Sequence, residues 1–312
     1  MDRALCTTMT DLRLHVIRTT VFALSAKGGN PCPIVLDADA LSSAQMQRLA
    51  AQFGSETAFV LKPADPGANL RLRYFVPRHE MEMCGHATVG TVAVLAERDY
   101  FHTSPVKVET PMGVLTVAWQ HNAGGVRVTV EQFAPTFSSQ RPDPEAVAAA
   151  LRIPVAAIAL KVGPMQSVSV SRAKLIVPVR ERAALDQLQP DFERLWALCD
   201  EYNTTGFYPF TRGVDKDANH AQARQFPKRA GYNEDPATGV AACALAAYLV
   251  QYAVFGEKNE GWHNFAIEQG HAMGRASIIE VAARVEHGRI VATRMSGGAK
   301  VLGEKDITLA AD

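Results

Sequence analysis

Two stretches of this chain contain no charged residue and no polar face. They cover residues 87–96 and 237–252. A helix without a polar face has to be buried on every side. Each stretch follows a carboxylate and small turn-forming residues, in EMCGHATVGTVAVL from Glu82 and in EDPATGVAACALAAYL from Glu234. These two segments, 152 positions apart, resemble copies of one element.

The repeated element predicts two similar lobes, each a sheet wrapped around a central helix. The helices are expected to begin at about Gly85 and Pro236, with both N-termini facing one cleft. A helix that opens on Gly, Ala and Thr leaves its first backbone N–H groups bare, so a small anion can approach them.

The remaining pattern alternates short strands with a few amphipathic helices. Ser42 or Ser43 is suited to cap a helix that ends near Phe53. Further helices are expected over residues 143–151 and 186–202. The string ASIIEVAARVEHGRIVATRM predicts a hairpin that turns at His287 and Gly288, and KVLGEKDITL predicts a last strand.

A Pro-, Ser- and Gln-rich string, QFAPTFSSQRPDP, separates the two halves. It places an N-terminal lobe over residues 13–131 and a C-terminal lobe over residues 142–299. Whether the last segment, about 300–312, returns to the first lobe is left open. Residues 1–12 are expected to form a loose tail.

Composition narrows the function classes. Lys plus Arg and Asp plus Glu both number 32, and no basic cluster is interleaved with aromatic residues, which argues against a nucleic-acid partner. The five cysteines are scattered and never spaced CxxC, as expected for reduced thiols in the cytoplasm. The N-terminus lacks the pattern of a signal peptide, and the alanine-rich segment 236–256 is expected to be a buried helix, with no membrane partner.

Four motifs in order carry a resemblance to a known family. They are GNPCPIVLDADALSSAQMQRLAAQFGSETAFV, MCGHATVG, EDPATGVA and EQGHAMGRAS. Together they resemble the phenazine-biosynthesis PhzF-like family, which has the diaminopimelate-epimerase-like fold. The resemblance covers the chain from residue 13 on. It implies an α+β fold of two pseudo-symmetric lobes, each a curved, mostly antiparallel, barrel-like sheet around a central helix.

The resemblance also implies an activity. It suggests a cofactor-independent isomerase that moves a proton on a small, carboxylate-bearing metabolite, without a metal or an organic cofactor, and that forms a homodimer. Glu56, in GSETAF, matches the family's acid/base carboxylate. That chemistry requires a carboxylate whose pKa is raised by partial burial, and Thr57, Ala58 and Phe59 are expected to supply the apolar surroundings.

Other positions match the family's site. His86 is expected to donate a hydrogen bond or relay a proton, and Asp235 to orient the substrate or share a proton with His86. Without the resemblance, Asp235 would be interpreted as a helix N-cap before Pro236. The expected substrate-binding residues are Asn30, Gly85, Thr238 and Gly239. Gln269, in the last motif, is interpreted as structural.

Two departures from the family pattern matter. Val240 follows ATG where members that carry out the known isomerisation usually have Ser, so the identity of the substrate is open. Cys84 precedes Gly85, as in the related two-cysteine racemases, but the position 152 residues later is Pro236, which excludes a pair of thiols. Cys84 is therefore expected to be a small buried residue, or else a second base opposite Glu56.

Three functions remain after this comparison. The first is a PhzF-like isomerase; the second is an amino-acid racemase or epimerase that uses Cys84 and Glu56 on opposite faces of its substrate; the third is a non-catalytic binding or scaffold protein. His79, Glu82, Cys84 and His86 lie close together in the sequence, but their spacing matches no usual zinc site, so no metal is expected. The chain also lacks a dinucleotide fingerprint, a phosphate-binding P-loop and a nucleophile elbow.

Overall fold

The computed structural model describes residues 12–309. The strands are β1 (Leu12–Val21), β2 (Asn30–Val35), β3 (Thr57–Leu61), β4 (Leu70–Phe75), β5 (Glu80–Met81), β6 (Val106–Thr110), β7 (Gly113–Asn122), β8 (Gly125–Gln132), β9 (Thr136–Phe137), β10 (Gln166–Ser169), β11 (Lys174–Pro178), β12 (Gly206–Thr211), β13 (Ala221–Ala223), β14 (Phe226–Pro227), β15 (Gly261–Gln269), β16 (Ser277–Glu286), β17 (Arg289–Gly297) and β18 (Ala299–Leu309). The α-helices are α1 (Ser43–Phe53), α2 (Gly85–Glu97), α3 (Pro144–Leu151), α4 (Arg182–Asp186), α5 (Phe192–Glu201) and α6 (Gly239–Gln251), with short 3-10 turns η1 (Ala38–Ala40), η2 (Val155–Ala157) and η3 (His271–Met273). Of the predicted loose tail, residues 1–11 lie outside the described residues, and Leu12 belongs to β1.

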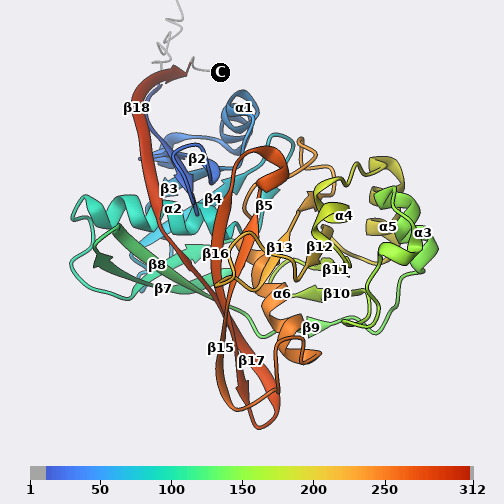
Figure 1. Ribbon diagram of the computed structural model, residues 1–312. Helices are drawn as coiled ribbons and strands as arrows, with labels where there is room; N and C mark the ends of the chain where they lie inside the picture. Colours follow the sequence, from blue (N-terminus) through green and yellow to red (C-terminus); the bar gives the residue numbers. More distant parts are fainter. Residues whose placement is uncertain (1–11, 310–312) are drawn as a thin grey trace, which may run out of the picture.

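Two lobes surround the helices α2 and α6, and the long strands β15 to β18 run between and beside them (Figure 1). Most neighbouring strands are antiparallel. The parallel pairs are β2–β3, β4–β6, β11–β12 and β13–β15. The predicted α+β fold of two lobes is confirmed by this arrangement.

The two halves of the chain exchange strands. β9 follows β8 in the sequence but pairs with β10 of the second half. β18 follows β17 but pairs with β1, in a register that runs from Leu12 opposite Leu309 to Val21 opposite Ala299. Between the exchanged strands, β8 and β17 pair antiparallel, with Val130 opposite Met295. The sheets of the two lobes are therefore continuous with each other.

The two uncharged segments form buried helices of 13 residues each, as predicted. α2 begins at Gly85, the predicted residue, but α6 begins at Gly239 and not at Pro236. The residues before Gly239 are held outside the helix, because the N–H of Asp235 donates to the carbonyl of Gln225 and the carbonyl of Ala237 accepts from Asn30. The residue that corresponds to the N-cap Cys84 is thus the N-cap Thr238, and it is not a thiol either.

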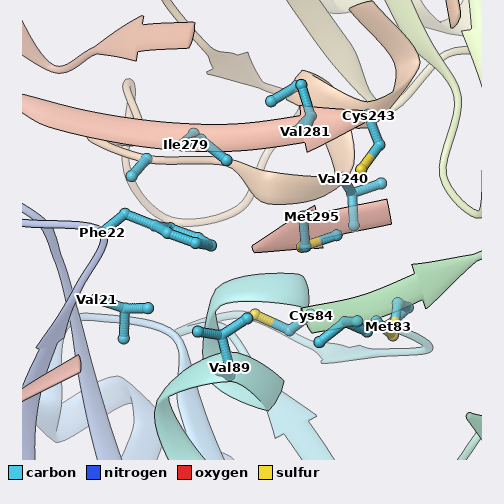
Figure 2. Close-up of a cluster of buried hydrophobic side chains, with 14 of the residues drawn as sticks. Val21, Phe22, Met83, Cys84, Val89, Val240, Cys243, Ile279, Val281 and Met295 are labelled. Atoms are coloured by element: carbon cyan, nitrogen blue, oxygen red, sulfur yellow. The ribbon is translucent and has the colours of Figure 1, made fainter. Parts of the chain in front are cut away.

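Met295 of β17 lies between the starts of the two helices (Figure 2). A Cβ atom added to Gly85 would lie 2.6 Å from the Met295 sulfur, and one added to Gly239 would lie 2.3 Å from it. A side chain at either position would therefore displace Met295, which packs against both helix starts because each begins with a glycine.

Local signals account for most of the other helices. Ser42 caps α1 in a capping box with Gln45, so the predicted start is confirmed. The single helix predicted over residues 186–202 is wrong, since α4 ends at Asp186 and α5 starts only after Pro190 and its N-cap Asp191. Pro190 lacks an N–H and cannot continue a helix. The hairpin of β16 and β17 turns at His287 and Gly288, as predicted.

The largest hydrophobic cluster contains residues of both central helices. Two smaller clusters lie outside it. One packs α1 against β1 to β4, and the other packs α3 to α5 against β11 and β12. In residues 12–309 no helix combines the length and the apolar character needed to cross a membrane.

Candidate active site

A cleft lies between the two lobes, at the starts of α2 and α6. It has a volume of about 40 Å³ and is lined by Glu56, His79, Cys84, Gly85 and His86 from the first half of the chain and by Arg172, Lys174, Gln225, Tyr232, Asp235, Thr238, Gly239 and Val240 from the second, among others. A buried water needs about 10–15 Å³, so in this conformation the space holds only a few water molecules, and a larger molecule binds only if the cleft widens. Except for Asn30, which contacts the cleft residues from behind, every predicted site residue lines this cleft.

Glu56 and His86 form an ion pair at the centre of the cleft. Glu56 lies just before β3 and His86 is the second residue of α2, so a strand entrance and a helix start bring them together. Glu56 Oε2 lies 3.0 Å from His86 Nδ1, and 11% and 3% of the two side chains are exposed. Glu56 Oε1 accepts a hydrogen bond of 2.7 Å from the Tyr232 hydroxyl.

This pairing reverses the pKa expected for Glu56. Burial alone would raise its pKa, but the charge and hydrogen bond of His86 outweigh burial, and with Tyr232 and Arg172 they lower the pKa to about 2. Burial opposes a charge on His86, yet its pKa is raised well above its ordinary value by Cys84 and by the Glu56 carboxylate. Since the Cys84 thiol is neutral at neutral pH, Glu56 supplies the negative charge. The expectation of a raised pKa at Glu56 is therefore wrong. The pair is a carboxylate and an imidazolium that share one proton.

Asp235 is the carboxyl group with the raised pKa. Burial, followed by the negative charge of Glu56, raises the pKa of Asp235 to about 7, although His86 and the hydrogen bonds from Thr238 and Asn30 act to lower it. Its two oxygens accept from Asn30 Nδ2, at 2.6 Å, and from the Thr238 hydroxyl. Asp235 does not cap α6, so the interpretation as a helix N-cap is wrong.

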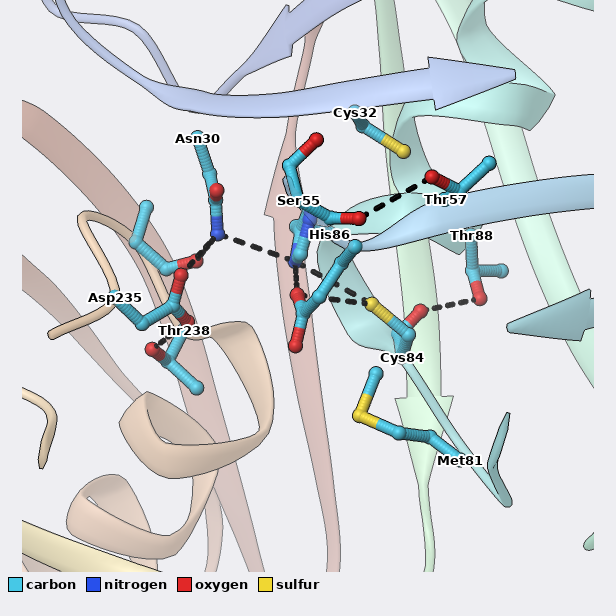
Figure 3. A network of polar contacts seen from close by, with 12 residues as sticks. Asn30, Cys32, Ser55, Thr57, Met81, Cys84, His86, Thr88, Asp235 and Thr238 are labelled. Carbon is cyan, nitrogen blue, oxygen red and sulfur yellow. Dashed lines mark hydrogen bonds and ion pairs between the residues drawn. The ribbon is translucent and has the colours of Figure 1, made fainter. Parts of the chain in front are cut away.

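Asn30 connects Asp235 with the Glu56–His86 pair (Figure 3). Its Nδ2 lies within hydrogen-bond distance of Asp235 Oδ1, the Ala237 carbonyl and His86 Nδ1, at 2.6, 2.8 and 3.3 Å. The amide has two hydrogens, and the two closer oxygens take them. His86 Nδ1 is then free to carry a proton and donate it to Glu56.

Cys84 lies on the same side of the cleft as Glu56. Its Sγ is 3.5 Å from Glu56 Oε2 and 3.4 Å from His86 Nδ1. Burial, and next the charge of Glu56, raises the pKa of the Cys84 thiol to about 12, so the thiol stays protonated at neutral pH. A two-base racemase needs its bases on opposite faces of the substrate, whereas these two groups are in direct contact.

The starts of both helices have the features of an anion site. Neither Cys84 nor Thr238, the two N-cap residues, makes a side-chain capping bond to its helix. Both helix starts are buried, and Gly85, His86, Gly239 and Val240 line the cleft. Bare N–H groups at a buried helix start attract negative charge, because the helix dipole adds to their own polarity. Thr238 is held in place by Gln269, whose side chain accepts from the Thr238 N–H and donates to the Asp235 carbonyl.

Several residues of this cleft were not predicted from the sequence. Tyr232 lies just upstream of the EDPATG motif and could have been included on that basis. Gln269 was interpreted as structural and indeed positions Asp235 and Thr238. Arg172, Lys174 and Gln225 come from segments that predicted ordinary strands, and the sequence carries no separate signal for them.

Three side chains of the cleft could also hold a metal ion. The ligand-type atoms of Glu56, Cys84 and His86 all lie within 4.8 Å of one another, the only such group in residues 12–309. The ion pair and the thiol hydrogen bond explain this proximity without a metal. Glu82 is not part of the group, and the absence of a metal stays a prediction.

The chain is similar to known proteins over nearly its whole length. The sequence profile of the PhzC-PhzF family, described as phenazine biosynthesis-like protein, matches residues 19–305. An uncharacterised isomerase of Clostridium acetobutylicum is 31% identical over 90% of this chain and 93% of its own. The trans-2,3-dihydro-3-hydroxyanthranilate isomerase of Pseudomonas chlororaphis is 29% identical over 95% of this chain and 99% of its own. The crystal structure of a PhzF-family phenazine biosynthesis protein of Bacillus anthracis has a TM-score of 0.86 at 28% identity and covers 95% of this chain and 99% of its own.

Proposed function

The chain belongs to the phenazine biosynthesis-like family and to the isomerase class of enzymes, and from this premise we propose that it moves a proton within a small metabolite that carries a carboxylate. The observation that carries the proposal is the contact of 3.0 Å between Glu56 and His86 in the cleft between two buried helix starts. The reaction uses side chains alone, without metal or organic cofactor.

Substrate binding is assigned to the two helix starts. A carboxylate of the substrate accepts hydrogen bonds from the bare N–H groups at Gly85 and Gly239. Val240 supplies an N–H but no hydroxyl at the position where known members usually have Ser. The bound acid therefore differs from the substrate of those members in the group that a hydroxyl would contact.

Glu56 is the base in this proposal. It removes a proton from carbon, the electron pair shifts into the conjugated system next to the substrate carboxylate, and a proton returns to a different carbon. A carboxylate with a pKa of about 2 is a weak base. The rate then depends on stabilising the carbanion, which is the task of the helix starts and of the His86 imidazolium.

Asp235 is the acid in this proposal: in its protonated form it delivers a proton to the receiving carbon, and the proton that Glu56 removed replaces it. With a pKa of about 7 it exists in both protonation states at neutral pH, which suits a group that gives and takes protons. Glu56 and Asp235 thus have pKa values that their surroundings push apart, the usual arrangement of a base and an acid in one site. Asn30 keeps the two in a fixed relation.

Deuterium uptake from heavy water tests the proposal. A panel of small amino and hydroxy carboxylic acids is incubated with the wild type and with Glu56→Gln, and uptake at carbon is followed by NMR. The wild type should label at least one acid, and Glu56→Gln should do so more slowly by a factor of about 10²–10⁴. If the variant retains more than about a tenth of the wild-type rate, Glu56 is not the base.

The stereochemistry of the labelled acid separates the isomerase from a racemase. Inversion at one carbon would favour the racemase, and a shifted double bond favours the isomerase proposed here. A wild type that labels no acid in the panel would favour a binding protein. We further propose a homodimer, which light scattering would contradict by a mass near 33.8 kDa.

A further inference from the structure

One wall of the cleft contains polar side chains that the proton transfer does not use. These are Arg172 and Lys174 from the β10–β11 connection and the start of β11, and Gln225 from the segment between β13 and β14. We call them the basic recess. All three line the cleft, on the side built by the second half of the chain.

Lys174 is buried without a partner. Only 5% of the residue is exposed, and no hydrogen bond or ion pair joins its ammonium group to another residue in the described part of the chain. Burial, followed by the charge of Arg172, lowers the pKa of Lys174 to about 7, even though Asp235 and Glu56 act in the other direction. Lys174 lines the same cleft as Glu56 and Asp235.

Gln225 is also buried without a hydrogen-bond partner for its side chain. The residue is 1% exposed, and neither its amide nitrogen nor its amide oxygen has a hydrogen-bond partner among residues 12–309. Its backbone carbonyl accepts from the N–H of Asp235, so it is fixed next to the candidate acid. Gly206 makes room for the side chain, since a Cβ there would lie 2.6 Å from Gln225 Nε2.

The backbone beside Lys174 is rigidly held. The carbonyl of Ala173 accepts three hydrogen bonds, from the Thr205 N–H at 2.9 Å and from the hydroxyls of Thr204 and Thr205 at 3.0 and 2.9 Å. Arg172 is positioned as well, by a contact of its guanidinium with the sulfur of Met81. The recess is therefore preorganised, as binding groups must be.

A buried ammonium or amide without a partner lowers stability, because it loses its hydration and gains nothing in exchange. Two such groups that line one cleft are difficult to explain as packing. Both point to a ligand atom that accepts hydrogen bonds and carries negative charge. The two oxygens of a carboxylate can accept hydrogen bonds from an ammonium, a guanidinium and an amide N–H at the same time.

We propose that the basic recess binds a second carboxylate of the substrate, so that the metabolite is a small dicarboxylate. The inference rests on the proposed function, in which the first carboxylate lies at the helix starts. The recess fixes the far end of the molecule and orients the carbon between the two anchors toward Glu56. It also explains how a chain with Val240 in place of Ser holds its substrate.

Binding of matched acids tests the inference without turnover. Malonate, succinate and glutarate are compared with butyrate by NMR or calorimetry, on the wild type and on Lys174→Met and Gln225→Leu. The exposed Lys27→Met serves as the control. At least one dicarboxylate should bind the wild type more tightly than butyrate does. Lys174→Met should weaken the binding of that dicarboxylate by about tenfold or more. Butyrate should bind all proteins within about twofold.

Thermal unfolding without ligand is the second readout. A binding residue that lacks a partner is expected to leave the midpoint of Lys174→Met unchanged or higher, whereas a structural lysine would lower it. Three results would overturn the inference. The wild type binds no dicarboxylate more tightly than butyrate, Lys174→Met binds the preferred dicarboxylate as tightly as the wild type does, or the unfolding midpoint of Lys174→Met falls below that of the wild type. The assignment to a carboxylate would also be overturned if the wild type binds inorganic phosphate but no dicarboxylate, and if Lys174→Met no longer binds phosphate. If Glu56→Gln keeps its activity, the proton-transfer assignment fails, but these binding results can still be interpreted.

Discussion

The amide of Asn30 donates to Asp235 Oδ1 over 2.6 Å, although the two residues are 205 positions apart. Asn30 is the first residue of β2, in one lobe, and Asp235 precedes α6, in the other. Both are almost fully buried. This hydrogen bond joins the lobes at the cleft, where the surroundings lower the pKa of Glu56 and raise that of Asp235.

Asn30→Ala should destabilise the protein. The substitution leaves Asp235 Oδ1 and the Ala237 carbonyl without their donor, and a buried group that loses its partner costs about 1–3 kcal/mol. The free energy of unfolding, measured in urea, should fall by that amount. The exposed Asn259→Ala is the control, expected within about 0.5 kcal/mol of the wild type. Equal stability of both variants would show that the bond between the lobes contributes nothing.

Cys84→Ala should retain most of the activity that Glu56→Gln loses. The thiol is protonated at neutral pH and touches the carboxylate proposed as the base, so no proton-transfer role of its own is expected. Turnover of any substrate found by deuterium uptake measures the effect, with circular dichroism as the check on folding. A comparable collapse in both variants would restore the racemase with two bases.

Asp235→Asn should change how stability depends on pH. The pKa of Asp235 is raised from 3.8 to about 7 in the folded protein, so between these values the folded state binds more protons than the unfolded chain. This group therefore makes the wild-type free energy of unfolding fall as the pH rises through that window. Asparagine cannot ionise, so its stability lacks this dependence on pH. Between about pH 4 and pH 8, the free energy of unfolding of the variant should rise relative to that of the wild type by on the order of 2–4 kcal/mol. Urea unfolding at both pH values measures the gain, with the exposed Asp217→Asn as control; a difference that does not vary with pH would contradict the raised pKa.

Gly239→Ala should destabilise the meeting point of the helices by about 1–3 kcal/mol. The added Cβ would lie 2.3 Å from the Met295 sulfur, which is also confined by Gly85. Gly124→Ala, whose Cβ would meet its nearest atom at 3.4 Å, is the matched control. The cost of Gly239→Ala should shrink in a Met295→Ala background, because the clash is then removed. Unfolding free energies of the four proteins test this, and additive effects would mean that the clash is not the cause.

Much of the fold could be predicted because its main signal is local. The buried helices follow from segments without charge, and the capping box at Ser42 and the hairpin at His287 follow from neighbouring residues. The break before α5 was also available in the sequence, as Pro190. The start of α6 was not, since Asp235 and Ala237 are kept out of the helix by Gln225 and Asn30, which are distant in the sequence.

The site was predictable in its members but less so in its electrostatics. The motifs identified Glu56, His86 and Asp235, and the structure brings all three to one cleft. Which of the two carboxyl groups has the raised pKa depends on which one contacts His86, and that contact exists only in the folded chain. Lys174 and Gln225 were missed for a related reason. Their significance is the lack of a partner, which no sequence pattern records.

The exchange of β9 and β18 bears on how such a chain could have arisen. Each half gives its last strand to the other half, and β8 and β17 pair across the boundary. Two copies of a half-length ancestor would make the same exchange between separate molecules, as a domain-swapped dimer does. Gene duplication and fusion would then have joined two subunits that already depended on each other. The cleft would have lain on the symmetry axis of that dimer, where one mutation changes both walls. After fusion the walls could diverge, with Cys84 and His86 on one side and Thr238 and Val240 on the other.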